Sequence, residues 1–256
     1  MIKLFITDLD GCVSHPHISP DWDTISEIRA LIEQSKTDST IPPMTICSGR
    51  PLPYVEAVSQ WLGMYHPMVF ESGGGIYDMK NNKLMWNASF DDKTERDLEA
   101  IKVYLKKNFV EKVPGAISEF AKRTDAGLIH QSASVIDEMY AEIVPYIEAN
   151  YPRFEVHYTD VSINIIAKTT NKGFGIRQLA ELLEIELNEI AYIGDTGGDI
   201  PGLKIVGQSF APKNAKDYVR AVCDYSLEED ATHAVLAAYK QIITHNREKL
   251  AAEEMV

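Results

Sequence analysis

The sequence is poor in cysteine and has no long apolar run. Its 256 residues include three cysteines, Cys12, Cys47 and Cys223, which are odd in number and far apart. This spacing favours neither a disulfide framework nor a zinc site, so we expect reduced thiols in a cytoplasmic protein. No apolar stretch approaches the ~18 residues of a membrane-spanning helix. Two acids among the first ten residues argue against a signal peptide.

Basic side chains are also scarce. The chain has 25 Lys and Arg against 38 Asp and Glu, a formal net charge of −13. Affinity for nucleic acid rests on neutralising phosphates, so we expect no nucleic-acid partner. The lack of a long apolar run likewise predicts no membrane partner. A small anionic substrate remains compatible with this charge, because a bound dication can invert the local field. The length suits one large or two modest domains, and the 45% hydrophobic content supports a core.

The first strand candidate ends in paired acids. Residues 2–7, IKLFIT, predict a buried parallel strand, and Asp8-Leu9-Asp10-Gly11 follows directly. An i, i+2 spacing sends both carboxylates in similar directions if the backbone stays extended. Close carboxylates repel, so the pair indicates a bound cation or a shared proton. A hard dication such as Mg²⁺ prefers these oxygen ligands.

A second strand candidate, residues 44–47, ends in Ser48-Gly49-Arg50 just before an amphipathic stretch. Backbone N–H groups at such a helix start suit a phosphate, and a plain helix N-cap is the alternative. Helical spacing over residues 21–36 follows a polar loop at 14–20. A third strand at 68–70 leads into a glycine-rich turn, and a hairpin is expected around 81–82.

From about residue 88 the pattern changes. Helices are expected at 91–107 and 135–149, with Pro145 a kink or a boundary, and strands at 154–158 and 161–166. Short alternating stretches lie at 113–120 and 127–131. Hairpins rather than βαβ crossovers indicate an α+β block. We therefore expect an inserted domain at 87–168 and a discontinuous core made of 1–86 and 169–256.

The core pattern then resumes. Lys172-Gly173 opens a helix, and residues 189–193 predict a strand that ends in Gly194-Asp195-Thr196-Gly197-Gly198-Asp199. Residues 204–207 are a further strand candidate, and 229–246 a closing helix with a frayed tail from 248. In a doubly wound parallel sheet the strand ends meet at one edge. Carboxylates, a lysine and a phosphate-sized nest at that edge indicate phosphoryl transfer.

These four motifs, in this order and spacing, resemble the haloacid dehalogenase superfamily, specifically its phosphatase branch. The insertion between Ser48 and Lys172 resembles the large α/β cap of the Cof-like and sucrose-phosphatase-like members. The resemblance covers the whole chain and implies a Rossmann-like α/β core, a doubly wound parallel sheet with an inserted α+β cap that sets substrate specificity.

The resemblance implies a role for each motif. Asp8 would be the nucleophile that forms an aspartyl-phosphate. Asp10 would protonate the leaving alkoxide and then activate water. Lys172 would offset the charge of Asp8 and the phosphate, and Ser48 would hold the transferring phosphoryl group.

Two binding sets follow from the same resemblance. Substrate and phosphate would be bound by Leu9, Ser48, Gly49, Arg50, Lys172 and Asn214. For Asn214 a loop contact and a plain helix N-cap stay open beside phosphate binding. Mg²⁺ would be bound by Asp8, Asp10 through its backbone carbonyl, Asp195 and Asp199, the last as a ligand or as a holder of water. Three positions depart from the family pattern, with Gly198 and Ser72 where asparagine is usual and Cys12 where threonine is frequent.

The predicted function is Mg²⁺-dependent hydrolysis of a small phosphorylated metabolite, a sugar phosphate or a phosphoglycolate-like ester, by a monomer or homodimer. A cap favours a small substrate, since a macromolecule would have to pass beneath it. Two alternatives stay open. One is a phosphomutase of the same superfamily, and the other is a non-catalytic, phosphate-responsive regulatory module.

Overall fold

The computed structural model describes residues 1–15 and 18–254. Pro16 and His17, in the expected loop at 14–20, and Met255 and Val256, in the expected tail, lie outside the described residues. The chain divides into two compact units. We call Met1–Met85 with Lys172–Val256 the core unit, and Trp86–Asn171 the cap unit.

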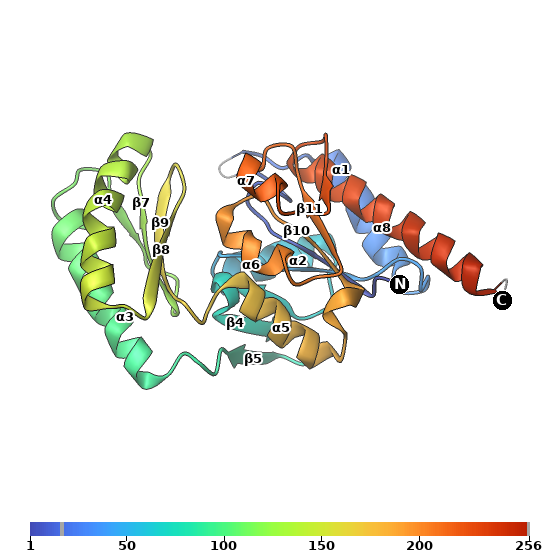
Figure 1. The fold of residues 1–256 in the computed structure, drawn as a ribbon, viewed down its shortest axis with the longest axis horizontal. Coiled ribbons are helices and arrows are strands. Elements are labelled where there is room, and N and C mark those ends of the chain that lie inside the picture. The colour runs from blue at the N-terminus through green and yellow to red at the C-terminus, as the bar shows by residue number, and fades with distance from the viewer. Residues whose placement is uncertain (16–17, 255–256) are drawn as a thin grey trace. The chain divides into compact units, whose positions relative to one another are not determined.

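The core unit is built on a five-stranded sheet whose pairs are all parallel (Figure 1). In spatial order its strands are β12 (Tyr225–Ser226), β11 (Gln208–Ala211), β10 (Ile190–Ile193), β1 (Leu4–Thr7) and β2 (Met44–Ile46). The central strand β1 is buried along its whole length, as its run of apolar residues predicts. The chain leaves β1 towards β2 on one side and meets β10 on the other, so β1 lies at a topological switch point.

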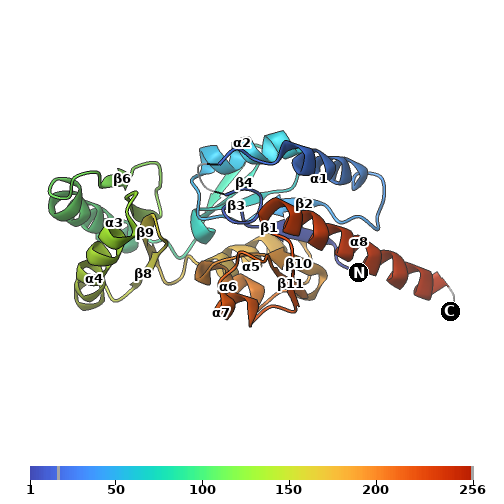
Figure 2. The ribbon, with the colours of Figure 1, turned by 90° about the horizontal axis from the view of Figure 1, so that it is seen from above.

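Helices lie above and below this sheet (Figure 2). One layer packs apolar side chains such as Ile176 and Leu179 against Leu4 and Ile6 of β1. On the other face, the Phe5 ring lies 5.3 Å from the Tyr239 ring. The helices of the core unit are α1 (Trp22–Gln34), α2 (Leu52–Leu62), α5 (Lys172–Leu183), α6 (Ile200–Leu203), α7 (Asp217–Arg220) and α8 (Ala231–Glu254).

Local chemistry sets the helix ends. Asp21 caps α1 by accepting hydrogen bonds from the backbone of Asp23 and Thr24. Gly63 ends α2 in the left-handed conformation that favours glycine. A smaller three-stranded sheet continues the core unit, with β3 (Met68–Phe70), β4 (Gly75–Asp78) and β5 (Lys83–Trp86) in that order.

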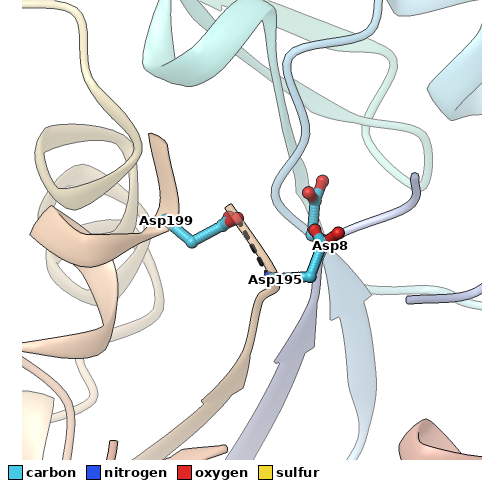
Figure 3. A group of neighbouring side chains, drawn as sticks. All are labelled: Asp8, Asp195 and Asp199. Atoms are coloured by element: carbon cyan, nitrogen blue, oxygen red, sulfur yellow. Dashed lines mark hydrogen bonds between the residues drawn. The ribbon is translucent and has the colours of Figure 1, made fainter. Parts of the chain in front are cut away.

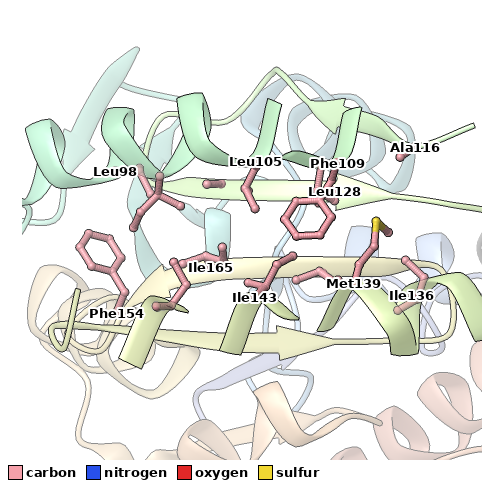
Figure 4. Close-up of a cluster of buried hydrophobic side chains, with 14 of the residues drawn as sticks. Leu98, Leu105, Phe109, Ala116, Leu128, Ile136, Met139, Ile143, Phe154 and Ile165 are labelled. Atoms are coloured by element: carbon pink, nitrogen blue, oxygen red, sulfur yellow. The ribbon is translucent and has the colours of Figure 1, made fainter. Parts of the chain in front are cut away.

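The cap unit has its own hydrophobic core between an antiparallel sheet and its helices (Figure 4). Leu128 on one strand and Ile165 on its neighbour pack with Leu98 and Ile143 from the helices, and all four are buried. The sheet order is β6 (Ile117–Glu119), β7 (Asp125–Ile129), β9 (Ser162–Ala167) and β8 (Phe154–Tyr158). The helices are α3 (Asp92–Leu105), extended by a π-helical turn at Lys106–Val110, and α4 (Ala133–Asn150).

The structure corrects three local predictions. Residues 204–207 do not form a strand, because the Gly207 N–H donates to Leu187 and Ile190 and the next strand begins at Gln208. Pro145 lies inside α4 and does not end it. Helix α8 continues to Glu254, through the good helix formers of the expected tail. Within residues 1–15 and 18–254, no helix is both long and apolar enough to cross a membrane.

Candidate active site

Asp8 and Asp195 meet at the carboxyl edge of the central strands (Figure 3). The register pairs Thr7 of β1 with Ile193 of β10, so the two motifs leave neighbouring strands at the same level. The Asp8 N–H donates to the Ile193 carbonyl at 3.0 Å and extends the ladder up to the acid. Far-apart segments of the sequence are thereby joined where ligands bind in open α/β sheets.

Two glycines permit this approach. Gly11 has a φ of +76°, and a Cβ at this position would lie 2.0 Å from a carboxylate oxygen of Asp195. At Gly194 a Cβ would lie 2.5 Å from the side chain of Asp199. Any side chain at either position would therefore push an acid out of the site.

Asp8 and Asp195 have the properties of metal ligands. Asp8, Asp195 and Asp199 can each offer an oxygen within 4.8 Å of the others. Oδ1 of Asp8 and Oδ1 of Asp195 are buried without a hydrogen-bond partner. Burial, together with the neighbouring acids, raises the pKa of Asp8 to about 7 and that of Asp195 to about 8. Two orphaned carboxylate oxygens side by side fit a hard dication such as Mg²⁺.

Lys172, at the start of α5, neutralises part of this charge. Its buried ammonium lies 2.7 Å from Oδ2 of Asp8 and 2.5 Å from Oδ1 of Asp199. Burial alone would lower the pKa of Lys172, but the carboxylates of Asp199 and Asp8 hold it well above its usual value. The lysine is therefore charged and shared between two acids.

Asp199 is bound by protein donors on both oxygens. Oδ1 accepts from Lys172 and from the hydroxyl of Tyr192, and Oδ2 accepts from the Asp195 N–H at 3.2 Å and from the N–H and hydroxyl of Thr196 at 2.9 and 3.0 Å. Burial opposes its ionisation, yet Lys172 and these bonds lower the pKa of Asp199. Of the two roles expected for Asp199, the geometry favours support of the site over direct metal ligation.

Asp10 points to a different partner. Its two oxygens accept from Nε and Nη2 of Arg50 at 2.6 and 2.8 Å. The Arg50 guanidinium also stacks 5.1 Å from the centre of the Tyr54 ring. The Asp10 side chain is thus held in a two-pronged ion pair, outside the group of three acids. The structure brings together the predicted acid–base residue and the arginine of the Ser48 motif.

The Ser48 motif is fixed by the neighbouring turn. The Ser48 N–H donates to the Val69 carbonyl, and the Ser72 N–H donates to the Ser48 carbonyl at 2.9 Å. Ser72 has φ +55°, a left-handed conformation that asparagine, usual at this position, adopts more readily. The Ser48 hydroxyl accepts from the Arg50 N–H at 3.3 Å. Leu9 and Gly49 follow the ends of β1 and β2, at the same edge.

Asn214 lies against the Asp8 loop. Its amide nitrogen donates to the Gly11 carbonyl and its oxygen accepts from the Ala231 N–H, each at 2.9 Å. The side chain thus ties the loop after β1 to the start of α8. This is the loop contact expected for Asn214, and binding of phosphate by its side chain stays a prediction.

Sequence reasoning missed Tyr192. It lies two residues before Gly194 in an otherwise apolar strand, so its only signal is one hydroxyl in a run of buried residues. Thr196 belongs to the motif at residues 194–199, but no role is predicted for it from the sequence. Both residues act on Asp199.

A family model of haloacid dehalogenase-like hydrolases matches residues 99–238, more than half of the chain. The chain belongs to this family. A phosphoglycolate phosphatase of Thermoplasma acidophilum is 26% identical over 231 residues, which span 88% of this chain and 91% of the relative. The chain is an enzyme of the phosphatase branch, as its four motifs predict.

Solved structures support the fold. A HAD/COF-like hydrolase from Plasmodium vivax is similar with a TM-score of 0.74 at 17% identity, covering 95% of this chain and 96% of that one. The sucrose-phosphatase of Synechocystis, solved with sucrose and phosphate, has a TM-score of 0.69 at 14% identity and covers 94% and 98%. The predicted α/β class with a parallel core sheet and an inserted cap is confirmed.

Proposed function

We propose that the protein hydrolyses small organic phosphate monoesters with Mg²⁺, through an aspartyl-phosphate on Asp8. The observation that carries this proposal is the environment of Asp8. One oxygen contacts the Lys172 ammonium, and the other is buried without a hydrogen-bond partner beside the similarly orphaned oxygen of Asp195. Lys172 thus offsets the charge of the proposed nucleophile, and the orphaned oxygens of Asp8 and Asp195 are available to a shared dication.

Asp8 and Asp195 would hold the Mg²⁺. When bound, the ion would supply positive charge that reduces the repulsion between the phosphate oxygens and the Asp8 carboxylate, which attacks phosphorus. Asp199 supports the arrangement indirectly, by fixing the backbone of residues 195–196 and by holding Lys172. The charged groups of the site are therefore held in place before the substrate binds.

The chemistry runs in two displacements on this chain's residues. A carboxylate oxygen of Asp8 attacks phosphorus, the bond from phosphorus to the ester oxygen breaks, and protonated Asp10 gives its proton to the leaving alkoxide. Asp10, now a carboxylate, takes a proton from water, and the resulting hydroxide attacks phosphorus. The bond from phosphorus to Asp8 breaks and releases inorganic phosphate.

The ion pair of Asp10 with Arg50 suits the second displacement. Both oxygens of Asp10 accept from the guanidinium, so this state is the carboxylate that activates water. A protonated Asp10 has one oxygen that must donate, so it leaves the two-pronged pair before it acts as an acid. Arg50 thus distinguishes the two states of the acid–base residue.

The cap unit contains a buried ion cluster of its own. The strand faces of the cap sheet alternate, and the face opposite the hydrophobic cluster carries Glu119, Asp125 and Asn164, all around the Lys122 ammonium. Lys122 lies 2.7 Å from Glu119, 2.9 Å from Asp125 and 3.1 Å from Asn164. Lys122 thus joins three neighbouring strands of the cap sheet.

We propose that the substrate is a small phosphorylated metabolite, either a sugar phosphate or a phosphoglycolate-like ester. The relatives named phosphoglycolate phosphatase support the second of these.

Phosphate release from a panel of esters, with Mg²⁺ and with EDTA, tests the reaction. The variant Asp8→Asn keeps the shape of the side chain but removes its nucleophilicity, so we expect turnover to fall at least about 10³-fold. Its circular dichroism spectrum serves as the folding control. Turnover that survives in Asp8→Asn would exclude the aspartyl-phosphate. Transfer of phosphate to a second position of the sugar, without release, would favour the mutase.

The substrate proposal is tested by comparing kcat/KM for 2-phosphoglycolate and for glucose 6-phosphate. Mg²⁺-dependent turnover of either ester supports the proposal. Turnover of neither ester, by a wild type that releases phosphate from other compounds, would contradict it.

A further inference from the structure

Tyr192 places a hydroxyl in the interior of the core unit, directly beneath the candidate site. The side chain is fully buried in β10, between strands that are themselves buried. Its hydroxyl donates to Oδ1 of Asp199. The ring packs where Gly202 leaves room, since a Cβ at Gly202 would lie 2.9 Å from the ring. A polar group in this place needs a partner, and the partner is a residue of the site.

The bond acts on the oxygen that also binds Lys172. The Lys172 ammonium lies 2.5 Å from that oxygen and 2.7 Å from Asp8, so two carboxylates compete for one cation. In a buried site such competition is strong, because solvent screens little of the charge. The Tyr192 hydroxyl is a second hydrogen-bond donor to this oxygen of Asp199 and offsets part of its negative charge. It therefore weakens the attraction between Asp199 and the Lys172 ammonium.

We propose that Tyr192 is a positioning residue, which keeps the Lys172 ammonium on Asp8 and on the transferring phosphoryl group by sharing Oδ1 of Asp199. The proposal rests on the proposed function, because it assigns Tyr192 a part in the same reaction. It makes Tyr192 act through Lys172, without contact with the substrate. The hydroxyl should matter most when negative charge is greatest at phosphorus, in the transition state.

Tyr192→Phe tests this with a matched control in the same unit. The replacement keeps the ring and removes only the hydroxyl. Tyr239 is equally buried, and its hydroxyl donates to the Pro42 carbonyl at 2.6 Å, outside the candidate site. Tyr239→Phe therefore measures the general cost of losing one buried hydrogen bond. Melting temperatures of both variants report whether each remains folded.

We expect kcat of Tyr192→Phe to fall about tenfold, as for loss of one hydrogen bond to a charged group, with KM for the ester unchanged. Inhibition by orthovanadate, which mimics phosphorus in transfer, should weaken by the same factor. Tyr239→Phe should keep both values.

Equal kcat in Tyr192→Phe and Tyr239→Phe would overturn the proposal, as would a change confined to KM. If the wild type releases no phosphate from any ester, the proposed function fails. The crystal structure of Tyr192→Phe then decides the role of the hydroxyl by itself. A Lys172 ammonium that moves from Asp8 towards Asp199 supports the positioning role, and one that stays within 2.7 Å of Asp8 overturns it.

Discussion

At the scale of residues, Asp8 and Asp195 have unusually high pKa values. Burial raises the pKa of Asp8 to about 7 and of Asp195 to about 8 in the absence of a metal. Both are far above the usual range near 4 for aspartate. At neutral pH the metal-free pair therefore retains protons, which a dication has to displace because it binds the carboxylate form.

Mg²⁺ affinity should consequently rise with pH and level off above about 8. Below pH 7 both acids hold protons, so binding weakens as pH falls, and at pH 7 we expect release of about one proton per Mg²⁺ bound. Titration calorimetry in two buffers of different ionisation heat measures that number. Asp195→Asn serves as the control and should reduce both the affinity and the proton release. Binding at pH 7 without proton release would contradict the prediction.

At the scale of elements, Asn246 joins three segments of the core unit. It lies fully buried in α8. Its oxygen accepts from the Ile2 N–H at 2.7 Å, and its nitrogen donates to the carbonyls of Ile2 and Thr40 at 2.8 and 3.1 Å. The side chain thus connects the closing helix to the residues that precede β1 and β2.

Asn246→Ala should lower the free energy of unfolding by about 3 kcal/mol or more, since it leaves three buried backbone groups without partners. Asn150→Ala is the control, because that exposed side chain bonds only to the Tyr146 carbonyl one turn back in α4. It should cost less than about 0.5 kcal/mol. Urea titrations of both variants provide the comparison. Equal losses would show that the three-segment contact contributes little.

The same examples show what the sequence predicts well and what it does not. The acids, glycines and lysine at the strand ends are restricted residue types, and their family pattern indicates the phosphatase class and fold. Asn246 and Tyr192 gave no such signal, because their partners come from distant segments and their meaning appears only after folding. The strand predicted at 204–207 is wrong. Ile205 and Val206 are residue types that favour strands, but the backbone hydrogen bonds of Gly207 require a turn.

At the scale of the whole molecule, the core unit is discontinuous in sequence, because the cap is inserted between its two segments. The cap unit runs from Trp86 to Asn171. Its incoming and outgoing segments are tied together, since Asn87 donates to the Thr169 carbonyl at 3.1 Å. The hydrophobic cluster of the cap, with Leu128 fully buried, stabilises this unit independently of the parallel sheet.

A weakened cap should therefore slow formation of the core. Leu128→Ala removes a buried side chain of the cap cluster at a cost of about 2–5 kcal/mol. We expect slower refolding of the core, followed by stopped-flow fluorescence in a Trp86→Phe background, where the remaining Trp22 and Trp61 both lie outside the cap unit. Leu179→Ala, in α5, is the comparison within the core itself. An unchanged refolding rate in Leu128→Ala would show that the core assembles before the cap.

The hydrogen bond between Asn87 and Thr169 affects how the two segments of the core find each other during folding. Without a folded cap, β1 can find β10 only after an open loop longer than the whole insertion closes. Once the cap has formed, its joined ends act as a short turn between the two halves of the core. The joined ends shorten the loop between β1 and β10 by nearly half, which saves about 0.5 kcal/mol of closure entropy. The folded cap then holds the two segments of the core close together during folding. The strand pairs of the parallel sheet become more local contacts than their separation in the sequence implies.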